Sequence, residues 1–131
     1  MQGIQDVKKL GLDAMELEFV RTVPTAFDIV TFDNVNNTNS YVDAGFGGTI
    51  ASLSINGYTG TITQNGNLTI TGDYSQTSGT FISNPTYTFS TGGSFSLPGG
   101  TFRRFTGSGT EALPYLIYDV YGVQAMKCGL T

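Results

Sequence analysis

Apolar and polar side chains alternate through the middle of the chain in short runs. Thr61-Ile62-Thr63, Thr69-Ile70-Thr71 and Thr86-Tyr87-Thr88 each place an apolar residue between two hydroxyl residues. Alternation with a period of two predicts strands that bury one face. Residue pairs that end in glycine lie between the runs and predict corners with positive φ. They are Asn56-Gly57, Asn65-Gly66, Ser78-Gly79 and Gly99-Gly100.

The runs also repeat about every 20 residues. Residues 72–81 match 93–102 at an offset of 93 − 72 = 21, with Gly, Ser, Gly, Thr and Phe in register. Gly60-Thr61-Ile62 stands 79 − 60 = 19 residues before the corresponding Gly-Thr-Phe. Short strands in a repeat of this length predict a parallel β-solenoid, in which each coil pairs with the coils above and below it.

A solenoid of this kind stacks equivalent apolar residues into internal ladders. The expected ladders are Ile55 with Tyr74 and Phe95, Ile62 with Phe81 and Phe102, and Leu68-Ile70 with Tyr87-Phe89. The fold expected is therefore mainly β, a short right-handed parallel β-solenoid with helical caps at both ends. Asn-Gly is also a strong hairpin signal, so an antiparallel β-sandwich is the alternative.

The two ends of the chain differ in composition from the middle, and they divide it into three segments. Residues 1–23 carry a helical apolar spacing at Ile4, Val7 and Leu10, followed by an alternating strand, and form a helix-strand cap segment. Residues 24–106 hold the solenoid repeats. Residues 107–131 read as a strand and a short helix, with Asp119 placed to cap that helix.

The repeat motif carries a resemblance to a known group of proteins. Gly72-Asp73-Tyr74-Ser75-Gln76-Thr77-Ser78-Gly79-Thr80-Phe81, followed by a second copy, resembles the β-helical regions of filamentous haemagglutinin-like adhesins and autotransporter passengers. The segment from Gly107 to Asp119, with Val123 to Met126, resembles the start of a GLUG-type module found in such proteins. The resemblance implies an extracellular or cell-surface location and an adhesive or structural role.

A second resemblance concerns the N-terminal segment alone. Residues 2–23 are similar to a helix-strand unit of the endonuclease IV and xylose isomerase-like TIM barrels. This likeness covers 22 of the 131 residues and includes no metal-ligand motif. Those barrels need about 250 residues, and their ligand sets include histidine, of which this chain has none. The enzymatic activity is therefore not carried over.

Composition further limits the kinds of site and partner that we expect. The chain has no His, one Cys and a net charge of −4, so no imidazole acid–base group, intrachain disulfide or multi-Cys zinc site is expected. No nucleic-acid partner is expected, because nucleic acid is usually met by clustered Lys and Arg. No run approaches the roughly 20 apolar residues of a membrane span. Cys128 is expected to be buried and inert.

Three sets of residues are candidates for a site. Asp28, Asp33 and Asp43, in an Asn-rich stretch, are oxygen ligands of the kind calcium takes, but they lack EF-hand spacing and are expected to form a plain surface loop. Arg103-Arg104 is expected to be a surface pair or a partner contact. Threonine ladders suggest ice binding, but Thr63 aligns with Ile82 and Arg103 instead of with threonine.

The sequence therefore predicts a protein without catalytic, cofactor-binding or metal-binding residues. Paired carboxylates for glycoside hydrolysis cannot be placed, so the chain is not expected to be an enzyme. We expect an extracellular structural or adhesive protein, which either caps its ends or stacks head to tail into a filament. A monomeric glycan- or ligand-binding module is the alternative, with ice binding as a minor one. The expected partners are other copies, other surface proteins or carbohydrate.

Overall fold

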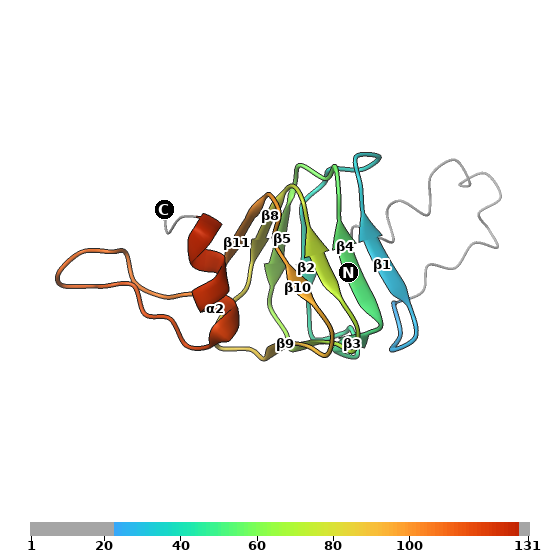
Figure 1. Ribbon diagram of the computed structural model, residues 1–131. Helices are drawn as coiled ribbons and strands as arrows, with labels where there is room; N and C mark the ends of the chain where they lie inside the picture. The colour runs from blue at the N-terminus through green and yellow to red at the C-terminus, as the bar shows by residue number, and fades with distance from the viewer. Residues whose placement is uncertain (1–22, 129–131) are drawn as a thin grey trace.

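The chain winds into a β-solenoid of about 4 turns, in which three parallel sheets form the walls (Figure 1). The computed structural model describes residues 23–128. The first wall contains β1 (Ile29–Phe32), β4 (Ser52–Ile55), β7 (Tyr74–Gln76) and β10 (Phe95–Ser96). The second contains β2 (Ser40–Val42), β5 (Thr61–Gln64), β8 (Thr80–Ile82) and β11 (Thr101–Arg103). The third contains β3 (Thr49–Ile50), β6 (Leu68–Ile70) and β9 (Phe89–Thr91).

Every pair of neighbouring strands in these sheets runs parallel. The solenoid prediction is therefore confirmed and the antiparallel sandwich is wrong. A single short helix lies near the C-terminus of the described residues, and the predicted N-terminal helix falls outside them. No helix among residues 23–128 has the length and apolar character needed to cross a membrane.

The register of the coils confirms part of the predicted ladders. Tyr74 pairs with Phe95, and Phe81 lies between Ile62 and Phe102. Two other predictions were wrong by two residues. The partner of Tyr74 in the coil below is Leu53, not Ile55.

In the third wall the partner of Leu68 is Phe89, not Tyr87. The error has a physical cause, because a two-residue slip keeps the same side chains facing inward. Alternation alone therefore cannot separate the two registers.

Corner length sets the true register. Partners are 74 − 53 = 21 residues apart between β4 and β7 but 80 − 61 = 19 apart between β5 and β8. The corner before β5 is thus two residues longer than the corner before β8. Its extra room is filled by Tyr58, which is fully buried and packs its ring 5.1 Å from that of Phe32.

Glycines at the corners behave as predicted at three of four positions. Gly57, Gly79 and Gly100 have positive φ, as expected for corners that only glycine enters without strain. Gly66 does not. A Cβ at Gly66 would lie 3.0 Å from the backbone of Asp43 in the coil below, so glycine is needed there for close approach.

The core changes character along the solenoid axis. Aliphatic side chains predominate in the core of the early coils, which also bury three aromatic ones, whereas the later coils stack aromatic rings. The rings of Phe81 and Phe102 are 5.3 Å apart and nearly parallel, and those of Tyr74 and Phe95 are 5.1 Å apart. Phe89 contacts four of these rings edge-on, completing one aromatic cluster.

A short C-terminal cap covers this aromatic end. It consists of α2 (Val120–Ala125) and the 3-10 turn η2 (Met126–Cys128). Asp119 caps α2 as predicted, since its Oδ1 accepts a hydrogen bond of 3.1 Å from the N–H of Gly122. Tyr121 packs against Phe89 and Phe95 at 5.1 Å from each.

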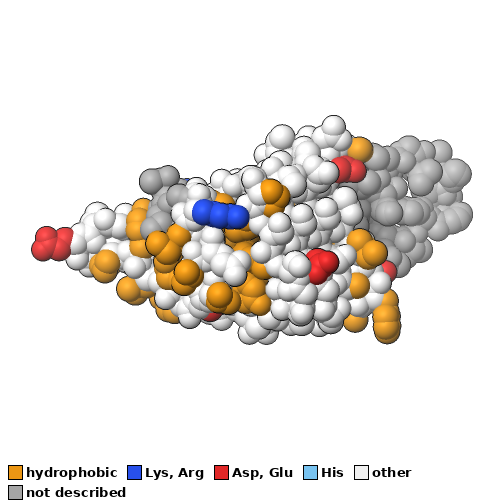
Figure 2. Space-filling view, in the orientation of Figure 1, with side chains coloured by type: hydrophobic (Ala, Val, Ile, Leu, Met, Phe, Trp, Pro, Cys, Tyr) orange, Lys and Arg blue, Asp and Glu red, His pale blue; other side chains and the backbone are white. Residues whose placement is uncertain are grey.

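The outer surface of the C-terminal segment is apolar in places. Figure 2 shows hydrophobic side chains gathered at this end of the molecule, while acidic side chains are scattered singly. The exposed apolar residues of the segment are Leu113, Leu116, Tyr118, Val120, Val123 and Met126. This end is therefore closed toward the core and apolar toward the outside.

Candidate binding pocket on the second sheet

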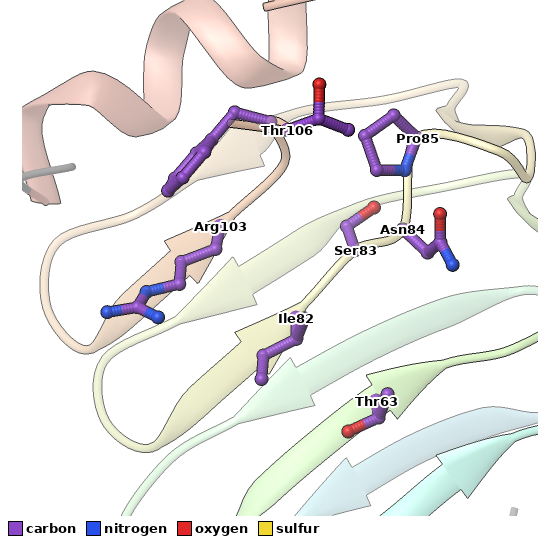
Figure 3. A pocket seen from close by; sticks show the side chains of 8 residues that line it. Thr63, Ile82, Ser83, Asn84, Pro85, Arg103 and Thr106 are labelled. Carbon is purple, nitrogen blue, oxygen red and sulfur yellow. The ribbon is translucent and has the colours of Figure 1, made fainter. Parts of the chain in front are cut away.

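A second change of corner length hollows the surface beside β8. The offset between partners is 19 from β5 to β8, but returns to 89 − 68 = 21 from β6 to β9. The connection after β8 therefore contains two more residues than the one below it. Asn84 and Pro85 lie in this longer connection, which stands beside the outer face of the sheet (Figure 3).

The result is a pocket of about 300 Å³. It is lined by Thr63, Ile82, Ser83, Asn84, Pro85, Arg103, Phe105 and Thr106. The size lies at the small end of ligand sites. The lining mixes one aromatic ring, two aliphatic surfaces, hydroxyls, an amide and a guanidinium.

The floor of the pocket is a row of outward-facing residues on three successive strands. Thr63, Ile82 and Arg103 are register partners on β5, β8 and β11, and Figure 3 shows them one above another. This is the alignment predicted from the repeat. Sequence reasoning used it only to argue against ice binding and did not connect it with a binding site.

Arg103 is the basic side chain of this pocket. Its Nε is buried and has no hydrogen-bond partner. No hydrogen bond or ion pair joins its guanidinium to another described residue, whereas the next residue, Arg104, is fully engaged. A buried donor without an acceptor is costly, and such exceptions often mark functional positions.

Arg104 points inward and is only 4% exposed. Its Nε donates to Asp119 Oδ2 at 2.8 Å, and its other nitrogens donate to Ser83 Oγ and to the carbonyls of Asn84 and Tyr87. The prediction of a surface pair at 103–104 is therefore wrong for Arg104. Alternation places neighbouring residues on opposite faces, and Arg104 fixes the pocket's Asn84 connection from inside.

The remaining wall of the pocket belongs to the C-terminal segment. The ring of Phe105 packs edge-on against Tyr115 at 4.8 Å. Thr106 forms two backbone hydrogen bonds with Leu116, of 3.1 and 2.9 Å, and its hydroxyl meets that of Tyr118 at 2.8 Å. Phe105 and Thr106 are thus held in place by residues outside the solenoid coils.

The acidic residues weighed for calcium do not share one loop. β1 separates Asp28 from Asp33, and β2 separates Asp33 from Asp43, so they occupy three different corners. Each carboxylate accepts a hydrogen bond from a nearby backbone N–H, of Thr25, Val35 and Gly45 respectively. Residues 23–128 contain no group of three or more His, Cys, Asp or Glu arranged for a metal ion.

Hydroxyl side chains form ladders on the outer walls. On the second wall Thr61, Thr80 and Thr101 are register partners, as predicted. On the first wall a ladder that the sequence reasoning missed joins Thr31, Ser54, Ser75 and Ser96. Each ladder presents one hydroxyl per coil, at the strand spacing of about 4.8 Å.

Other polar groups inside the solenoid support the fold. Burial raises the pKa of the Tyr74 phenol well above its usual value, and its hydroxyl donates to Gln76 Oε1 at 2.7 Å. The amide of Gln76 donates in turn to the corner carbonyls of Ser78 and Gly79. Cys128 is half-buried against the aromatic core.

A second hollow, of about 340 Å³, lies at the corner after β2. Its one charged side chain is Asp43, which is already bonded to Gly45. It therefore offers less chemistry than the pocket on the second sheet.

Comparison with known proteins yields no relative: no protein family, curated protein or solved structure matches this chain.

Proposed function

We propose that the chain is a non-catalytic, extracellular or cell-surface adhesive module that binds carbohydrate through the pocket on the second sheet. The observation that carries the proposal is the pocket's lining. Phe105 supplies an aromatic ring that can pack on the C–H side of a sugar ring, while Asn84, Thr63 and Thr106 supply amide and hydroxyl groups that can bond to its hydroxyls. The resemblance of the repeats to adhesin β-helices supports the same proposal.

The surface around the pocket suits an extended sugar chain. The Thr61–Thr80–Thr101 ladder runs along the same wall, two residues from the Thr63–Ile82–Arg103 row. Its hydroxyls both donate and accept hydrogen bonds. A glycan held in the pocket therefore continues over a polar, uncharged strip.

The closed end of the solenoid favours a capped module over a head-to-tail filament. A filament of stacked coils needs open strand edges at both ends. Here α2 and η2 pack over the aromatic end, and Arg104 binds the cap residue Asp119. Stacking on this end requires the cap to be displaced.

A glycan array tests the proposal. We expect the wild-type chain to bind a subset of glycans, and Thr63→Arg, which fills the pocket from its floor, to lose that binding. Thr31→Ala, on the opposite hydroxyl ladder, is the matched control and should bind normally. No binding by the wild type, or equal binding by Thr63→Arg, would contradict the proposal.

Light scattering and negative-stain microscopy test the filament alternative. We expect a monomer over a wide concentration range. Regular fibres formed by the wild type would favour the filament and contradict the capped module.

A further inference from the structure

Resting on the proposed carbohydrate function, we infer that the pocket selects sugars that carry an anionic group, and that Arg103 binds this group. The inference starts from the charge of the described segment. Its basic residues are Arg103, Arg104 and Lys127, against six acidic residues. Arg104 is buried in its pair with Asp119, which leaves Arg103 as the basic side chain lining a pocket.

An arginine at this place favours anions over neutral sugars. A planar guanidinium binds carboxylate or sulfate oxygens through two parallel N–H bonds, a geometry that a neutral hydroxyl cannot reproduce. Only the Nε of Arg103 is a buried donor without an acceptor, so the terminal guanidinium nitrogens are the donors that an anion can reach.

The residues around Arg103 indicate the chemical character of the ligand beyond its anionic group. Ile82 lies beside it in register and gives an apolar surface, and Phe105 follows on the same chain segment. Asn84 and Pro85 also line the pocket, and the side chain of Arg103 extends away from them (Figure 3). No acidic residue lines the pocket, so nothing in the lining repels an anion. We expect this lining to suit one sugar ring that carries a carboxylate or sulfate group.

Three conjugates that share one ring test this inference. Glucuronate, glucose and glucose 6-sulfate are coupled to the same carrier, and binding of the wild-type chain is measured by biolayer interferometry. We expect glucuronate or glucose 6-sulfate to bind at least tenfold more tightly than glucose. The better of the two identifies the anion.

Two variants assign the effect to Arg103. Arg103→Gln should lower affinity for the anionic conjugate roughly 10- to 100-fold, the loss expected for a charge-assisted pair. Lys127→Gln removes the same charge from an exposed position and should have no effect. Arg103→Lys keeps the charge without the planar fork and should recover only part of the affinity.

The outcomes separate this inference from the function on which it rests. If the three conjugates bind equally and Arg103→Gln changes nothing, the anion inference fails while carbohydrate binding stands. If Lys127→Gln weakens binding as much as Arg103→Gln, the attraction is to overall charge and the assignment to Arg103 fails. If neither the conjugates nor the wider array bind, the carbohydrate function fails as well.

Discussion

The aliphatic and aromatic halves of the solenoid fill equivalent positions with different side chains. Leu68 in the third wall has Phe89 as its register partner one coil later, and both are almost completely buried. Leu68 lies in the coil before the aromatic cluster. Phe89 contacts five rings, including that of Tyr121 in the cap. The comparison indicates that the aromatic half both closes the core and anchors the cap.

Truncating the two partners separates these roles. We expect Phe89→Ala to cost about 4 kcal/mol of unfolding free energy and Leu68→Ala about 3 kcal/mol, measured by urea denaturation. Hydrogen exchange should show the cap opening in Phe89→Ala alone, because Phe89 packs against Tyr121 whereas Leu68 lies one coil further from the cap. Equal protection of the cap in both variants would contradict the anchoring role.

The ion pair between Arg104 and Asp119 is expected to make the next largest contribution to the free energy of unfolding. Asp119→Ala leaves the guanidinium of Arg104 buried without its charge partner and removes the N-cap of α2. We expect a loss of about 3 kcal/mol in unfolding free energy.

Asp119→Asn is the matched control, because asparagine also caps helices. Both variants lose the charge pair, so their difference in unfolding free energy measures the contribution of helix capping alone. Equal stability of both variants would mean that capping contributes nothing.

Alkaline pH should affect the aromatic half through Tyr74. Burial raises the pKa of this phenol in the folded state, so above about pH 10 the unfolded chain loses a proton that the folded chain keeps. Stability should therefore fall as pH rises through this range. Tyr74→Phe should cost about 1 kcal/mol at neutral pH, by losing the bond to Gln76, but show a shallower alkaline decline. An unchanged decline, followed by circular dichroism, would contradict this.

The sequence predicted the solenoid because alternation and the coil repeat are both visible in it. It could not fix the register everywhere. The 19-residue offset holds only between β5 and β8. The connections that contain Tyr58 and Asn84-Pro85 are each two residues longer than their counterparts, and a difference of two leaves the same side chains facing inward. The pocket was missed for this reason, since Asn84 and Pro85 in the second of these longer connections form part of its lining.

The burial of Arg104 was missed for a different reason. A charged residue is expected at the surface, and its partner Asp119 lies 119 − 104 = 15 residues further along the chain. Only the folding of the cap onto the last coil brings the two together. Alternation along the strand could have predicted this burial. Phe102 was predicted to face inward, and Arg104, two residues further along the extended chain, faces the same side.

Tyr121 has a consequence beyond packing. Its hydroxyl accepts a hydrogen bond of 2.9 Å from the N–H of Thr91, on the outermost strand of the third wall. A parallel stack that simply stopped would leave this donor free to recruit a strand from another molecule. The phenol of Tyr121 thus occupies one backbone donor at the edge of the third wall, where an added strand would otherwise bond.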